Sequence, residues 1–230
     1  MPTDAGVYKT RAVVSTYDEY ESAMSDPVTF KIKSIPSYTV PGINAKDVYY
    51  GATLGSVYSD EQLKELLGVP KFNTNTEITG SWSWGDGSEK STGDKGTKTF
   101  KAQFTPDTEI IDDFGWDSVP GWDSSAKVIK VDVPVNVKAQ PIGDDAQISL
   151  DKSEFVYNGK GQEPVVTVKI GSKILEENKD YTITWPADIK NAGTKKITIN
   201  FKGNYSGRAE AQYTIKKAEK PAKTNSDRRR

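Results

Sequence analysis

The sequence predicts a mostly all-β fold made of tandem modules, each a β-sandwich or a β-grasp-like sheet. Short segments alternate β-branched or aromatic residues with polar ones, which is the period of a strand with one buried face. Gly, Pro, Asn and Asp separate these segments, as they do in turns. One pattern of a turn followed by a strand occurs three times along the 230 residues. Together these observations predict repeated β modules.

The repeated pattern starts at an Asx–x–Gly turn. The three copies are Asp4-Ala5-Gly6, Asp94-Lys95-Gly96 and Asn191-Ala192-Gly193. Glycine accepts the positive φ that such a turn requires, and the Asx side chain caps the turn locally. Each copy continues into one alternating segment and ends on a second, over 28–32, 131–137 and 213–215. Each copy is therefore expected to form a pair of strands that closes a module.

Only two of the three copies have an opening half. Val48-Tyr49-Tyr50-Gly51 precedes the middle copy and Phe155-Val156-Tyr157-Asn158-Gly159 the last one, and nothing comparable precedes the first. We therefore expect 1–34 to be the C-terminal part of a truncated repeat, 35–139 a complete module and 140–218 a smaller complete module. Residues 219–230, which end in three arginines, are expected to be a disordered basic tail. This organisation suggests a monomeric excerpt from a longer multidomain chain.

A single segment, 59–68, has the pattern of a helix. Ser59 or Asp60 is suited to the N-cap, Leu63, Leu66 and Leu67 form an apolar stripe, and Gly68 is suited to the C-terminal end. We expect one short helix covering the sheet of the middle module.

Composition excludes several kinds of chemistry. The chain contains no Cys and no His, so thiol catalysis, zinc–thiolate sites and nucleophile–His triads are all excluded. Lys and Arg together number 31 and Asp and Glu 32, a balance that gives no net field toward nucleic acid. No apolar run is long enough to span a membrane. The expectation is a protein that is not an enzyme, binds no nucleic acid, inserts into no membrane and carries no cofactor.

The motifs of the middle module resemble a class of bacterial repeat. Gly80-Ser81-Trp82-Ser83-Trp84 is followed by a strand beginning Gly96-Thr97-Lys98-Thr99-Phe100 and by the Val-rich closing strand. This order is similar to MBG-type and related Ig-like repeats of Gram-positive cell-surface proteins, and the last module resembles a shorter relative. The resemblance implies a stalk or spacer in a secreted or cell-wall-anchored protein that presents an adhesive or enzymatic head. It implies no catalytic residues.

The middle module departs from this pattern in a long insert over 107–126. A long loop with aromatic residues is where a binding function is expected. The candidate ligand-binding residues are Trp116, Trp122, Asp112, Asp113 and Asp117. The alternative function is therefore adhesin-like binding of host or plant glycans or surface proteins. The two tryptophans could instead form a lid on the core, and the carboxylates either a solvated loop or a Ca²⁺ site.

Two further alternatives concern the middle module. Trp82 and Trp84 lie on one face of a strand, which is either the core or an exposed platform for sugar rings. Lys46 and Asn136 could form an intramolecular isopeptide crosslink, with Glu77 or Glu109 as the nearby acid. Core packing is the preferred interpretation of the tryptophans.

Overall fold

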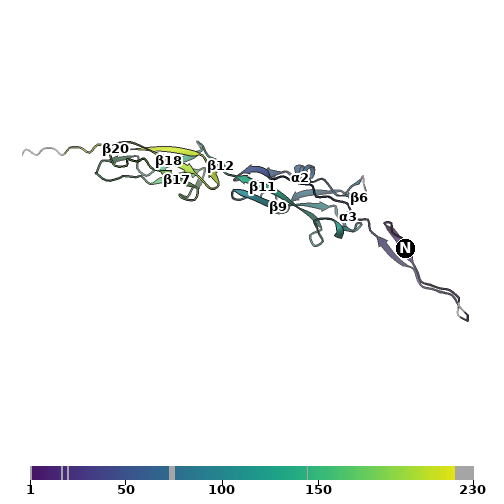
Figure 1. Ribbon diagram of the computed structural model, residues 1–230. Coiled ribbons are helices and arrows are strands. Elements are labelled where there is room, and N and C mark those ends of the chain that lie inside the picture. Colours follow the sequence, from purple (N-terminus) through teal and green to yellow (C-terminus); the bar gives the residue numbers. More distant parts are fainter. Residues whose placement is uncertain (1, 17, 20, 73–75, 144, 221–230) are drawn as a thin grey trace, which may run out of the picture. The chain divides into compact units, whose positions relative to one another are not determined.

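The computed structural model describes residues 2–16, 18–19, 21–72, 76–143 and 145–220. Strands account for 46% and helices for 9%, which confirms the all-β prediction. The chain divides into two compact units (Figure 1). Unit 1 comprises 1–48, 52–92 and 97–136, and unit 2 comprises 49–51, 93–96 and 137–230. Residues 221–230 of the predicted tail lie outside the described residues.

Unit 1 begins with a two-stranded hairpin. β1 (Gly6–Thr10) pairs antiparallel with β4 (Val28–Ile32), and β2 (Val13–Val14) pairs with β3 (Ala23–Met24). Both predicted strands are present, but the prediction of a buried face is wrong for this copy, because Val28 is 64% exposed. Within the described residues, β1 and β4 form a sheet of two strands with no second layer over it.

The main sheet of unit 1 has five strands. They are β5 (Lys46–Tyr49), β8 (Gly80–Trp84), β9 (Gly96–Pro106), β10 (Trp122–Asp123) and β11 (Val128–Lys138). The order is β10-β11-β9-β8, with β5 also paired to β11. The valines of β11 at 131, 133, 135 and 137 are all buried, as their alternation predicts. Smaller elements are β6 (Lys71–Phe72), β7 (Thr76–Glu77), α3 (Thr108–Ile111) and η1 (Trp116–Ser118).

The predicted helix is α2 (Asp60–Leu67), preceded by a short helix α1 (Leu54–Val57) that the sequence analysis missed. Ser59 and Gln62 form a reciprocal capping box at the start of α2, and Gly68 is the C-cap of α2. Its Leu63 and Leu67 are buried. Helix α2 packs on β8, so a helical layer covers this sheet.

Trp82 and Trp84 belong to the core of unit 1, as preferred from the sequence. Both are almost fully buried, and each uses its indole N–H to bind the helical layer. Trp82 donates to the carbonyl of Gly68 at 2.6 Å, and Trp84 donates to that of Tyr58 at 2.9 Å. These bonds satisfy the polar atom of each ring, so burial of the indole carries no free-energy penalty for an unpaired N–H.

Unit 2 contains two sheets that share one core. The first has three strands, β13 (Ala146–Leu150), β15 (Val166–Ile170) and β16 (Lys173–Ile174). The second has the order β14-β20-β18-β17, from β14 (Glu154–Val156), β17 (Tyr181–Thr184), β18 (Gly193–Phe201) and β20 (Arg208–Lys216). Val168 of the first sheet and Ile197 and Tyr213 of the second belong to the same buried cluster. Two sheets around one core are typical of a β-sandwich.

The opening segment of unit 2 pairs with its closing segment. β12 (Gln140–Pro141) is parallel to β19 (Tyr205–Ser206), and β14 is parallel to β20. Gly207 separates β19 from β20 at a φ of 108°, and a Cβ there would overlap the carbonyl oxygen of Ile142. Glycine is therefore required where these two backbones approach each other.

Candidate functional site

The insert over 107–126 folds against the core. Trp116 is 4% exposed, and its indole N–H donates to the carbonyl of Ile111 at 2.9 Å. Its ring stacks on that of Trp122, with centroids 4.7 Å apart and planes 18° from parallel. Trp122 lies on β10, where it pairs with Ile129 of β11. Trp116 therefore offers no exposed ring face, and the tryptophan pair closes one region of the core.

Four of the five candidate residues, all except Asp113, line the same hollow. The hollow has a volume of about 150 Å³ and is bounded by both tryptophans, Asp112, Asp117 and two lysines. The lysines are Lys33 and Lys127. This volume is below the roughly 300–1,000 Å³ of sites that enclose an organic ligand. The arrangement can hold water or a small charged group rather than a sugar ring.

Asp113 is separate from that hollow. Its carboxylate accepts a 2.6 Å hydrogen bond from the amino group of Lys31 on the N-terminal hairpin. This bond and the lysine charge hold the pKa of Asp113 below its usual value. The side chains of both residues are exposed, so the ion pair contributes little stability. Asp113 therefore contacts the hairpin.

The acidic residues of the insert do not converge on a cation site. Within the part of the chain that the structure describes, no three acidic side chains are grouped as metal ligands. Asp123 instead caps a turn, with one carboxylate oxygen accepting from the N–H groups of Ser125 and Ala126 and the other from Lys130 at 2.7 Å. These bonds lower the pKa of Asp123. The carboxylate oxygens of Asp123 therefore stabilise the local turn and its contact with β11.

The two residues considered for an isopeptide bond have different partners. The amino group of Lys46 contacts the carbonyl of Val57 and lies 4.2 Å from the ring centroid of Tyr58. The amide of Asn136 donates to the carboxylate of Asp47 at 2.6 Å. Asp47 points toward Asn136, and neighbouring residues on a strand point to opposite faces. Lys46 therefore points away from Asn136.

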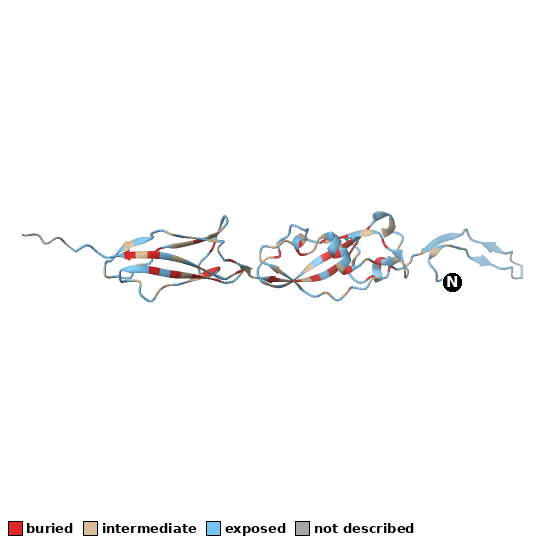
Figure 2. Cartoon of the chain, turned by 90° about the horizontal axis from the view of Figure 1, so that it is seen from above, coloured by how far each residue is buried: buried red, intermediate tan, exposed pale blue. Residues whose placement is uncertain are grey.

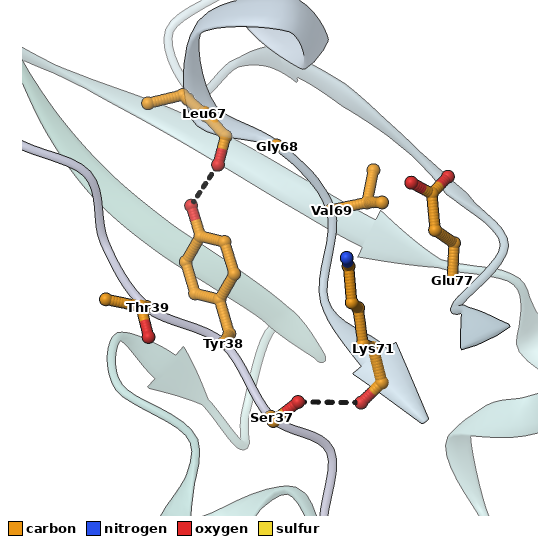
Figure 3. A pocket seen from close by; sticks show the side chains of 8 residues that line it. All are labelled: Ser37, Tyr38, Thr39, Leu67, Gly68, Val69, Lys71 and Glu77. Atoms are coloured by element: carbon orange, nitrogen blue, oxygen red, sulfur yellow. Dashed lines mark hydrogen bonds between the residues drawn. The ribbon is translucent and has the colours of Figure 1, made fainter. Parts of the chain in front are cut away.

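A second hollow, which sequence reasoning missed, lies beside the C-terminal end of α2 (Figure 3). Its volume is about 380 Å³, and its lining residues are Ser37, Tyr38, Thr39, Leu67, Gly68, Val69, Lys71 and Glu77. The hydroxyl of Tyr38 donates to the carbonyl of Leu67 at 3.1 Å, and burial raises the pKa of Tyr38 to about 12. The hydroxyl of Ser37 donates to the carbonyl of Lys71 at 3.3 Å. An aromatic residue soon after Pro36 was the available signal, but it is equally typical of core packing.

No family model matches the chain, and no curated protein matches it. No helix among the described residues is long and apolar enough to cross a membrane.

Proposed function

We propose that this chain is a non-catalytic spacer region of a secreted or cell-wall-anchored bacterial surface protein, presenting an adhesive or enzymatic head carried elsewhere. The observation that carries the proposal is the parallel pairing of the opening and closing segments of unit 2. The resemblance of its motifs to MBG-type repeats of Gram-positive surface proteins supports the location, and the absence of Cys and His supports a role without catalysis.

Parallel pairing places the two ends of the module far apart. Gln140 lies opposite Tyr205, and Phe155 lies opposite Ile215, so the opening segment follows the closing one along its length. The chain thus enters near residue 205 and leaves near residue 216. At about 3.3 Å per residue these positions are roughly 35 Å apart. A module with this arrangement adds length to a chain, as a spacer requires.

The same arrangement resists tension. When the two ends are pulled apart, opening and closing segments slide in opposite directions, so all the bonds between them are loaded together. Four backbone hydrogen bonds of 2.8–2.9 Å join the segments: Gln140 to Asn204, Ile142 to Ser206, Thr214 to Ser153 and Tyr157 to Lys216. An antiparallel pair pulled from its open end would lose such bonds one at a time. This predicts a high unfolding force.

Single-molecule force spectroscopy on the full chain tests the proposal. Unfolding residues 140–218 releases roughly 25 nm of chain at about 3.6 Å per residue, so a force peak followed by an extension of that size is expected. Tyr157→Pro removes the N–H that binds Lys216 and is expected to lower this peak. Tyr157→Ala keeps the N–H and serves as the matched control.

A gradual extension without a peak would contradict the spacer proposal, as would equal unfolding forces for the proline and alanine variants. Circular dichroism of both variants at zero force verifies that each remains folded before it is pulled.

Adhesin-like binding of glycans or proteins through the insert has weaker support. A sugar-stacking platform needs an exposed ring face, and Trp116 is buried beneath Trp122.

A further inference from the structure

The N-terminal hairpin has the same register as the closing hairpin of unit 2. Gly6 pairs with Ile32 in the first, and Gly193 pairs with Ile215 in the second. Continuing along both pairs, Tyr8–Phe30 corresponds to Lys195–Tyr213. Both closing strands also end alike, as Phe30-Lys31-Ile32-Lys33 and Tyr213-Thr214-Ile215-Lys216. Each position on β4 therefore has a defined counterpart on β20.

The counterparts differ in what covers them. Tyr213 is 1% exposed and shares a buried cluster with Val168 of the three-stranded sheet, whereas Phe30 is 38% exposed. Figure 2 shows the contrast, with the hairpin beside the N label coloured mostly as exposed. A hollow of about 470 Å³ opens at Tyr8 and Phe30 and is largely apolar. The aromatic face that forms a core in unit 2 is thus an open concave surface on the hairpin.

The outer edge of β4 has the same polar groups that β20 uses. In unit 2 the N–H of Thr214 donates to Ser153, and the carbonyl of Lys216 accepts from Tyr157. By register, the equivalents are the N–H of Lys31 and the carbonyl of Lys33. Within the described residues, β1 is the strand that β4 pairs with, and it lies on the other side. An open strand edge of this kind is a template for an added strand.

Charge also matches between the two edges. Lys216 forms a 2.7 Å ion pair with Glu154 on β14, the strand that pairs with β20. Lys33, the residue that follows β4, is the sequence equivalent of Lys216 in this alignment and is exposed. A strand resembling Glu154-Phe155-Val156 would place its acid beside Lys33 and its aromatic residue opposite Ile32, as Phe155 lies opposite Ile215.

We propose that the outer edge of β4 and the Tyr8–Phe30 face form a docking surface for the opening strand of another β module. The bound strand runs parallel to β4 and has the order acidic, aromatic, aliphatic. Its backbone pairs with Lys31 and Lys33, and its module covers the hollow over Tyr8 and Phe30. This docking does not depend on the spacer function, because it is derived from the register and exposure of the hairpin.

Hydrogen exchange of the full chain, followed by mass spectrometry, tests this with a synthetic peptide of residues 151–159 as the probe. At saturating peptide, exchange over 28–33 is expected to slow at least tenfold, because the N–H of Lys31 gains a partner. A control peptide with Phe155→Asp is expected to give no protection. Lys33→Glu is expected to weaken binding of the original peptide a few-fold and to favour binding of a Glu154→Lys peptide. The effect is small because an exposed ion pair contributes little to affinity.

Three results would overturn the proposal. The first is unchanged exchange over 28–33 with the peptide in millimolar excess. The second is protection confined to 208–216, which would show that the probe only displaces β14 from β20. The third is a dimer in sedimentation equilibrium that protects 28–33 and resists the peptide, since a second copy would then be the occupant.

Discussion

The closing hairpins β1–β4 and β18–β20 have one register and opposite environments. In β18–β20 the alternate residues Ile197, Ile199 and Phe201 are buried against a second sheet. In β1–β4 the corresponding face is open, and an isolated two-stranded hairpin is only marginally stable in water. The comparison teaches that an alternating pattern specifies a strand and its two faces, whereas burial of a face depends on whether another layer is present.

The largest expected difference is for the paired aromatic residues. Tyr213→Ala should destabilise unit 2 by about 3–5 kcal/mol, because it empties a fully buried site. Phe30→Ala should cost about 1 kcal/mol or less, because its ring is partly exposed and mainly stacks on Tyr8. Urea unfolding followed by hydrogen exchange over each hairpin measures both. Similar costs at the two positions would invalidate the contrast.

Exchanging the residue types of Ile197 and Thr10, the next positions along β18 and β1, should change stability less than Tyr213→Ala does. Ile197 corresponds to Thr10 by register. Ile197→Thr places a hydroxyl in the core and should cost about 2–3 kcal/mol, whereas Thr10→Ile should change stability by less than about 0.5 kcal/mol. The same unfolding measurement applies. A large stabilisation by Thr10→Ile would mean that the hairpin face is already covered.

A pH-dependent effect is expected at the pair Lys195–Asp188. Lys195 is buried on β18, and its amino group donates to Asp188 at 2.9 Å. The carboxylate also accepts from the N–H groups of Lys190 and Asn191. The N–H of Asn191, the amino group of Lys195 and the N–H of Lys190 lower the pKa of Asp188 well below its ordinary value.

A carboxyl with a lowered pKa in the folded state stabilises the protein above its unfolded pKa of about 4, and this contribution is lost as the pH falls further. Asp188→Asn should therefore lower the melting temperature at pH 7 and flatten its decline below pH 4. Melting curves at pH 2–7 test this. Parallel curves for the variant and the original chain would exclude Asp188 as the cause.

The smallest effect is expected at the ion pair that joins the hairpin to the insert. Lys31→Ala removes the partner of Asp113, but both side chains are exposed. Exposed pairs contribute little, so the urea midpoint of unit 1 should not change measurably. A clear loss of stability would show that this pair, rather than a missing layer, determines the state of the hairpin.

Much of the architecture was predictable from local patterns. The Asx–x–Gly turns precede β1, β9 and β18, each of which begins at the predicted glycine. The capping residues of α2 were predictable because capping involves residues within one turn of each other. Trp82 and Trp84 were predictable as core because alternation places them on one face of a strand.

The candidate site was less predictable. The insert composition singled out Trp116 and Trp122, and the structure stacks their rings on each other. Trp116 is buried, as the alternative of a lid on the core expected, and it donates to the carbonyl of Ile111. The pairing of Asp113 with Lys31 had no local signal, because the two residues lie far apart in sequence. The hollow at Tyr38 was missed because it forms between segments distant in sequence.

By itself, the sequence determined where strands and turns occur, because backbone preferences and side-chain periodicity act over a few residues. Only the tertiary structure decided which alternating faces are buried, because burial requires a second layer from another part of the chain. For this reason Phe30 and Tyr213, which share a pattern and a register, differ so widely in exposure. The parallel pairing of opening and closing segments, on which the proposed function depends, is likewise a property of the folded module.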